Sequence, residues 1–240
     1  MTDPTKILAI ETATSNCSVA LQCGELMYER SQTGNNIHSQ VLLEMVQDVL
    51  HEGGLKALDI DAVAVGQGPG SFTGLRIGVG VAQGIAYGAN CPMIGVSSLA
   101  ALVAQAQIKK QMPVNSTVLA AIDARMNEVY WGVFKANLEP ELLGSLNVSA
   151  PEKIGFPISH VLNDSEKMYL VGNAWSEYQH DFDAALLRQA EQIKECFFPL
   201  ATGVLVIAEK MYLSQKFVSP IEFAPTYVRN NVAKKKLPNS

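Results

Sequence analysis

The sequence has few charged residues. They make up 17% of its 240 residues, below the ~25% of ordinary soluble domains, whereas 48% of the residues are hydrophobic. A surface with so little charge favours contact with a partner protein. The net charge of −5 argues against a free-standing nucleic-acid-binding protein, which needs a strongly basic face. We therefore expect any contact with RNA to be shared with a partner.

Cysteine is scarce and long hydrophobic runs are absent. The four cysteines show no C-x-x-C spacing and are too few for a disulfide scaffold (Cys17, Cys23, Cys91 and Cys196). The sequence contains no run of ~18 apolar residues that would predict a membrane span. The first residues, MTDPTK, lack the basic and apolar regions of a secretory signal. We expect a soluble cytoplasmic protein with reduced thiols and no contact with membranes.

The first half of the chain reads as strands followed by alternating helices and strands. Strands are predicted at 6–11, 17–22 and 25–31, a helix after them, a buried strand at 60–66, a glycine-rich helix, the strand PMIGV at 92–96, and a helix to about residue 106. The segment 60–66 is a short apolar run, which is typical of a parallel strand that is buried on both faces.

The second half partly repeats this order. Strands are predicted at 117–123, 128–134, 142–148 and 168–172, and an amphipathic helix at 201–217 closes the chain. The sequence therefore predicts a duplicated α/β architecture with two βββαβα-type lobes. A polar, proline-bearing loop near Lys109–Pro113 places the division between residues 1–108 and 109–240.

The glycine-rich helix contains more glycine than its first turn requires. Each interior glycine costs ~1 kcal/mol relative to alanine, so the five together cost roughly 4–5 kcal/mol (Gly74, Gly78, Gly80, Gly84 and Gly88). At ~100° per residue they fall within one arc of about 160°. Only the first helical turn has free N–H groups for an anion, so phosphate binding does not explain the later glycines. Close packing on the chain's own sheet and packing against another chain both remain open.

The preceding helix favours the contact with another chain. Its apolar arc is wider than one face of a sheet would cover, and Ser71 is the predicted N-cap of the glycine-rich helix beside it. We therefore predict an interface on these two helices, formed by Ile37, His38, Val41, Leu42, Met45, Val46, Phe72, Gly74, Ile77, Gly78, Val81, Gly84 and Ile85. His38 is expected to make a contact there and not to coordinate a metal.

Four segments of the sequence resemble the TsaB family, also called YeaZ. They are ILAIETATSNCSVAL (7–21), GQGPGSFTGLRIGVGVAQGIA (66–86), AAIDARMNEVYW (120–131) and YVRNNVAKKKLP (227–238). The resemblance implies the two-lobed α/β fold of actin, Hsp70 and the sugar kinases. It also implies work in making threonylcarbamoyladenosine, the modified base beside the anticodon of tRNAs that read codons beginning with A.

The resemblance further implies a role without catalysis. TsaB is implied to bind TsaD, the paralogue that transfers the threonylcarbamoyl group, through a helical bundle, with the ATPase TsaE joining the assembly and tRNA bound within it. Family members are also implied to form homodimers through the same surface. A stand-alone ATPase or kinase of the same fold is the alternative hypothesis.

The residues at the implied catalytic positions do not fit a metal site. TsaD holds its metal with two histidines at H-x-x-x-H spacing, and Ser98 and Leu102 are the matching positions here. Leucine offers no lone pair to a metal. The four histidines show no metal spacing either, so no metal, catalytic residue or cofactor is predicted (His38, His51, His160 and His180).

Some candidate ligand contacts remain. Glu11 stands where active members of this superfamily carry Asp, and with Thr12 and Thr14 it forms a candidate nucleotide-binding set. Asp123 with Arg125 either faces a cleft or closes a turn as an ion pair. The basic tail is either a candidate tRNA contact or a solvated segment (Arg229, Lys234, Lys235 and Lys236).

Overall fold

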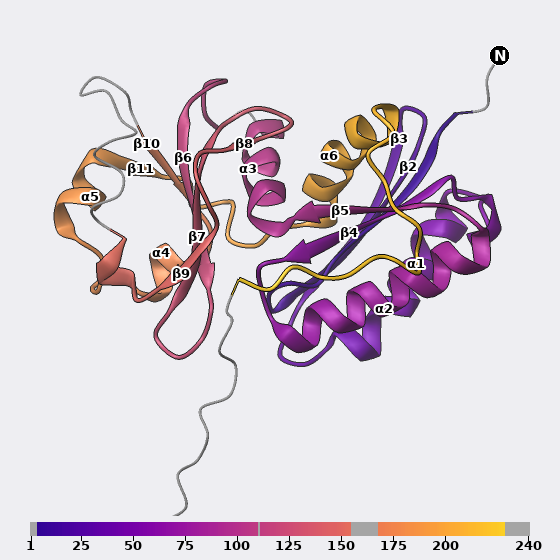
Figure 1. Cartoon of the computed structure of the whole chain (residues 1–240), viewed down its shortest axis with the longest axis horizontal. Coiled ribbons are helices and arrows are strands. Elements are labelled where there is room, and N and C mark those ends of the chain that lie inside the picture. The colour runs from indigo at the N-terminus through magenta and orange to yellow at the C-terminus, as the bar shows by residue number, and fades with distance from the viewer. Residues whose placement is uncertain (1–3, 110, 155–167, 229–240) are drawn as a thin grey trace, which may run out of the picture.

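A computed structural model describes residues 4–109, 111–154 and 168–228, which form two lobes, each built on a β-sheet (Figure 1). The first sheet has the strand order β3-β2-β1-β4-β5. Its strands are β1 (Lys6–Glu11), β2 (Asn16–Cys23), β3 (Leu26–Thr33), β4 (Ala62–Gly68) and β5 (Met93–Ser97). The first three strands pair antiparallel, whereas β4 and β5 run parallel to β1.

The second sheet repeats this pattern. Its order is β11-β10-β6-β7-β8, with β9 also pairing with β7. The strands are β6 (Thr117–Asp123), β7 (Val129–Lys135), β8 (Glu141–Leu142), β9 (Asn147–Ser149), β10 (Met168–Val171) and β11 (Ala190–Gln192). β6 and β7 pair antiparallel, and β10 lies parallel to β6, as β4 lies parallel to β1. This duplication confirms the predicted two-lobed α/β fold.

The structure differs from the sequence-based expectation in the second lobe. The strand predicted at 142–148 is split into β8 and β9 around Gly144, whose positive φ of 97° interrupts the pairing. Four short elements described in this lobe were not predicted: the 3-10 helix η2 (Pro151–Lys153), α4 (Ala174–Glu177), α5 (Ala184–Gln189) and β11. The last helix, α6 (Ala201–Leu213), ends before the predicted residue 217, because Gln215 has a left-handed backbone with φ 56°.

Helices cover both faces of the first sheet. Side chains of a strand point alternately to its two faces, so Leu8 and Ile10 pack toward α1 (His38–Glu52) and α2 (Phe72–Ala89). Ile7 and Ala9 point the other way, toward α3 (Ser98–Ile108) and α6. The strands are therefore buried on both sides, as their continuous apolar sequence predicts.

The pair α3 and α6 lies between the two sheets (Figure 1). α6 follows the second sheet in the sequence but packs on β1, β2, β4 and β5, and the N–H of Ala201 donates to the buried Ser18 Oγ at 2.9 Å. Gly203 of α6 lies directly against the backbone of Ala101 in α3. The predicted division at residues 108 and 109 separates the two sheets along the chain, and α6 connects them again in space.

The chain after α6 forms an extended strap, residues 216–228, that crosses the edge of the first sheet (Figure 1). Val218 and Met93 of β5 exchange two backbone hydrogen bonds of 2.9 Å. Gln83 of α2 donates to the carbonyls of Pro220 and Phe223, and the N–H of Thr226 donates to the Gln67 carbonyl. The strap therefore covers the β5 edge and ends beside α2. Within the described ranges, no helix combines the length and the hydrophobicity that crossing a membrane requires.

The contact between α3 and α6 gives a prediction for stability. We expect Gly203→Ala to lower the free energy of unfolding by about 1–3 kcal/mol, because its methyl group would meet the Ala101 carbonyl. Gly80→Ala is the matched control, since nothing lies within 4 Å of a methyl group there. Better helix propensity should raise the stability of that variant by up to about 1 kcal/mol. Urea unfolding measures both, and equal stability of the two variants would contradict the tight crossing.

Candidate functional site

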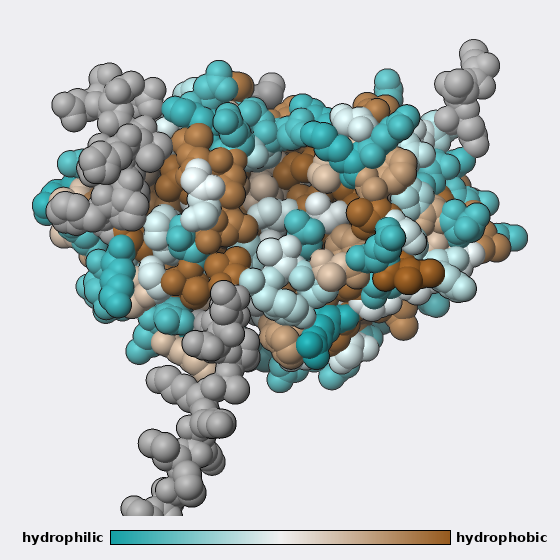
Figure 2. Space-filling view, in the orientation of Figure 1, coloured by the Kyte–Doolittle hydropathy of each residue, from teal (hydrophilic) through white to brown (hydrophobic). Residues whose placement is uncertain are grey.

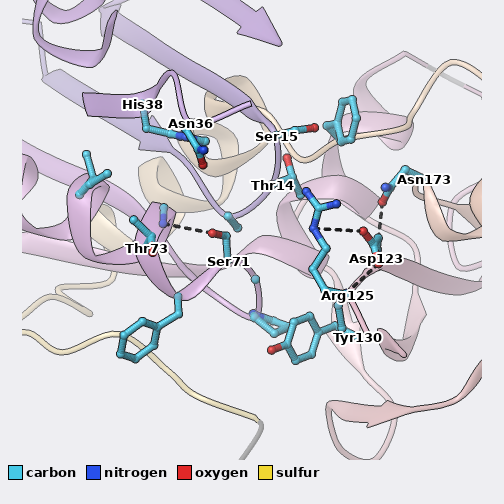
Figure 3. Close-up of a pocket in the computed structure, with 18 of the residues that line it drawn as sticks. Thr14, Ser15, Asn36, His38, Ser71, Thr73, Asp123, Arg125, Tyr130 and Asn173 are labelled. Carbon is cyan, nitrogen blue, oxygen red and sulfur yellow. Dashed lines mark hydrogen bonds and ion pairs between the residues drawn. The ribbon is translucent and has the colours of Figure 1, made fainter. Parts of the chain in front are cut away.

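A cavity of about 400 Å³ opens between the two lobes (Figure 3). The first lobe contributes the turn between β1 and β2, the segment before α1 and the first turn of α2, including Thr14, Asn36 and Ser71. The second lobe contributes Asp123 and Arg125 from the turn between β6 and β7. The end of the strap closes one side. The cavity brings together groups that are more than one hundred residues apart in the sequence.

The three candidate nucleotide-binding residues are not equally placed. Thr14 lines the cavity, whereas Glu11 and Thr12 do not. The Thr12 hydroxyl donates to the Gly74 carbonyl at 2.9 Å, and both residues are buried, so it is used in packing β1 against α2. Of the three side chains, only that of Thr14 is placed to meet a ligand in this cavity.

Glu11 is fully buried below the cavity. Its Oε1 accepts a hydrogen bond of 2.7 Å from the N–H of Ala13, whereas Oε2 has no hydrogen-bond partner and lies against Gly66. Burial raises the pKa of Glu11 to about 7, although the hydrogen bond from Ala13 and the nearby Ser98 side chain act in the opposite direction. A carboxyl with this pKa is partly protonated at neutral pH.

The opposite wall of the cavity is held by Asp123. Its Oδ1 accepts hydrogen bonds from the N–H of Arg125 at 2.7 Å and from the Tyr178 hydroxyl at 2.8 Å, and Oδ2 lies 3.5 Å from Arg125 Nε. The ion pair therefore closes the turn, and both residues also line the cavity, so the two interpretations left open by the sequence hold together. Figure 3 shows the guanidinium of Arg125 directed across the cavity toward Thr14.

No cluster suited to a metal is found in the part of the chain that the structure describes, where no three His, Cys, Asp or Glu side chains converge. Ser98 and Leu102, at the positions of the implied metal ligands, are completely buried in α3. His38 is 6% exposed and its Nε2 has no hydrogen-bond partner. His160 and the basic tail (Arg229, Lys234, Lys235 and Lys236) lie outside the described residues.

The glycines of α2 lie on two different faces of the helix. Gly74 and Gly78 are buried against Thr12, with no room for a side chain. Gly80, Gly84 and Gly88 point into open space, with no atom within 4 Å of the place that a side-chain methyl group would take. The first pair packs the helix on its own sheet. The second set forms an exposed stripe that intrachain packing does not explain.

The predicted interface is divided in the same way. Six of its residues are buried within the chain and cannot reach a partner in this state: His38, Leu42, Met45, Val46, Gly74 and Gly78. The other seven remain half-buried or exposed: Ile37, Val41, Phe72, Ile77, Val81, Gly84 and Ile85. Ser71 caps α2 as predicted, since its Oγ accepts from the N–H of Gly74 at 3.2 Å.

One cluster on α2 gave no signal in the sequence. The Arg76 guanidinium lies 3.9 Å from the ring centroid of Phe72, and its Nε donates to the Tyr227 hydroxyl at 3.3 Å. The Tyr227 ring lies 5.5 Å from that of Phe72. Because 151 residues separate Arg76 from Tyr227, only the folded strap brings them together.

Comparison with known proteins identifies the family. The protein called tRNA threonylcarbamoyladenosine biosynthesis protein TsaB in Escherichia coli is 40% identical over 97% of this chain and 98% of its own length. The TsaB protein of Haemophilus influenzae is 36% identical, over 97% of both chains. The chain belongs to the TsaB (YeaZ) family. Its role therefore lies in tRNA threonylcarbamoyladenosine biosynthesis.

Two further comparisons describe the TsaB chain as a whole. The structure of YeaZ from Pseudomonas aeruginosa, 34% identical, superposes with a TM-score of 0.82 and covers 93% of this chain and 99% of its own. A family model described as TsaD, tRNA N6-adenosine threonylcarbamoyltransferase, matches residues 32–237. The chain is thus built on the same domain type as the transferase.

The burial of Glu11 gives a pH-dependent prediction for this TsaB chain. The folded state favours the protonated carboxyl, so wild-type stability falls as pH rises from the ordinary pKa near 4.5 to about 7, and stays lower above it. Glu11→Gln cannot ionise. We expect it to raise the Tm by about 2–6 °C at pH 8 and by much less at pH 5. Thermal unfolding at the two pH values measures this, and a difference that does not change with pH would show that Glu11 is already ionised when folded.

Proposed function

We propose that this chain is the non-catalytic partner of TsaD in the threonylcarbamoyl transfer that forms threonylcarbamoyladenosine. In this role it holds and activates TsaD beside the anticodon of tRNAs that read codons beginning with A. The match of the chain to the TsaD family model supports a pairing of two related domains. Related domains present equivalent helices, so they can dock face to face with pseudo-two-fold symmetry.

The exposed glycine stripe of α2 carries this proposal. We define the docking surface as Ile37, Val41, Ile77, Gly80, Val81, Gly84, Ile85 and Gly88. Gly80, Gly84 and Gly88 recur every four residues and let another helix approach the backbone closely. Half-buried Ile77, Val81 and Ile85 line the stripe on the side of α1. An apolar surface strip with exposed glycines is better suited to contact with a helix of a partner than to exposure to water.

The chemistry of the cleft supports a role without catalysis. Glu11 is buried and turned away from the cavity, and Thr12 is engaged with the backbone of α2. The positions of the implied metal ligands hold Ser98 and Leu102 in a packed interior. We therefore assign the transfer to TsaD and a supporting role to this chain, acting in the cytoplasm where tRNA is modified.

The remaining partners follow from the same assignment. TsaE joins the complex, tRNA binds to the assembly, and the basic tail of this chain is a candidate contact for the RNA. In the absence of TsaD, two copies of the chain associate through the docking surface. Such a homodimer competes with the TsaD complex, because both use the same residues.

Reconstitution from purified proteins tests the proposed function. We expect TsaD with TsaE and the preformed threonylcarbamoyl donor to modify tRNA at least tenfold faster when this chain is added. Equal rates with and without the chain would rule out an activating partner.

The cavity supports a second candidate function, that of a stand-alone ATPase or kinase. ATP turnover by the isolated chain distinguishes the two functions. We expect none above background, whereas turnover that is lost in Glu11→Ala would favour the enzyme.

A single substitution tests the docking surface. Gly84→Leu fits the free chain, since nothing lies within 4 Å of a Cβ atom at that position, and leucine is the better helix former, so its Tm should equal that of wild type or exceed it by up to about 4 °C. A partner helix would be forced away, and we expect complex formation with TsaD to weaken at least tenfold in size-exclusion chromatography or calorimetry. Lys210→Leu, at an exposed position of α6, is the matched control and should leave assembly unchanged. An unaltered complex in Gly84→Leu would place the interface elsewhere.

A further inference from the structure

The cluster of Phe72, Arg76 and Tyr227 has exposed planar groups. Phe72 is 42% and Tyr227 43% exposed, and both line the mouth of the interlobe cavity. Arg76 is exposed as well. Within the described ranges no carboxylate pairs with it, whereas Arg30 and Arg125 each have an acidic partner. The cluster therefore presents two aromatic rings and an arginine whose charge is not neutralised.

The arginine is held in a fixed position. Its guanidinium stacks on Phe72 at 3.9 Å, and Nε donates to Tyr227 at 3.3 Å. This leaves the two terminal amino groups without a described partner. A guanidinium that is already oriented loses little side-chain entropy when it binds, and its plane can stack on an unpaired base while its N–H groups contact phosphate or a base edge.

The strap fixes the other half of the cluster. The N–H of Thr226 donates to the Gln67 carbonyl at 2.8 Å, and the buried Phe223 packs against Gly95. Tyr227 is therefore presented from an anchored backbone. Figure 2 shows hydrophobic side chains at the surface on this face of the first lobe, along the path of the strap.

The end of the sequence contains basic residues and no acidic ones. Four of the 18 basic residues and none of the 23 acidic residues lie in 229–240, directly after the strap. A basic segment at the end of an otherwise acidic chain is typical of binding to a polyanion. Aromatic rings combined with arginine next to such a segment are typical of single-stranded nucleic-acid sites.

We infer that Phe72, Arg76 and Tyr227 form a stacking platform for an unpaired base of the RNA, in the loop that contains the modified adenosine. The inference rests on the proposed function for the presence of RNA. Arg76 and Tyr227 lie outside the docking surface. Phe72 precedes Gly80, the first glycine of the stripe, by eight residues, about 12 Å along α2, so the platform lies at the N-terminal end of this helix, beside the docking surface.

Binding of an unmodified anticodon stem-loop to the complex with TsaD tests the platform. We expect Tyr227→Leu to weaken binding about 5- to 100-fold in fluorescence anisotropy, because leucine keeps the apolar contact with Phe72 but cannot stack on a base. Tyr227→Phe keeps the ring and should stay within about twofold of wild type. A fully paired RNA duplex of the same length should bind all three proteins equally.

The failures of the two proposals are distinguishable. If wild-type chain and TsaD form no complex, the proposed function is wrong. If the complex forms and Tyr227→Leu binds the stem-loop like wild type, the platform alone is wrong. An equal loss for stem-loop and duplex would show a contact that does not require an unpaired base and would also overturn it.

A second variant covers the case in which Tyr227→Leu disturbs the strap. Arg76→Gln removes the guanidinium from the exposed surface of α2 and leaves Tyr227 in place. We expect it to weaken stem-loop binding at least fivefold while the Tm and the amount of complex remain unchanged. RNA binding that falls only in proportion to the amount of complex in both variants would contradict the platform.

Discussion

The burial of the first sheet on both faces is the constraint on which the rest of the structure depends. β1 and β4 have apolar residues at successive positions, so neither face can be left to water. α1 and α2 cover one face. On the other face α3 is joined by α6, with which the chain returns from the second lobe. This return joins the lobes through the crossing at Gly203, and it carries the strap to α2.

The same constraint fixes the residues that lie below the cleft. Tight packing of α2 on β1 uses the Thr12 hydroxyl and places Gly74 and Gly78 against it. Glu11, at the end of β1, is enclosed by Gly66 and α3, and burial raises its pKa. Two of the three residues that the sequence offers as candidate nucleotide ligands, Glu11 and Thr12, are thus used in packing. The interlobe cavity keeps Thr14 and Arg125 on its walls, and the Asp123 carboxylate beside them is paired with Arg125.

Much of this was predictable from local sequence. Continuous apolar runs predicted the buried strands, and the motif from Gly66 to Ala86 predicted a capped helix after a turn. The helical wheel also placed all five glycines of α2 in one arc. The helical wheel could not show that some glycines of this arc are buried against the sheet and others are exposed to solvent, because this division depends on the position of Thr12. For the same reason, the apolar residues of α1 did not reveal that Leu42, Met45 and Val46 are used by the chain's own core.

Contacts across long sequence distances were beyond sequence analysis. Tyr227 was visible only as part of a family motif, and nothing in its spacing connects it to Arg76. The fold brings them together because Gln83, on the same helix, holds the strap by two carbonyls and so fixes where the strap meets α2. One helix then has three uses along its length and around its circumference. Buried glycines attach it to the sheet, exposed glycines leave room for another helix, and its first turns carry aromatic and basic groups. The proposed docking surface and the proposed RNA contact can be separate on one chain because the strap, and not α2 alone, completes the second of them.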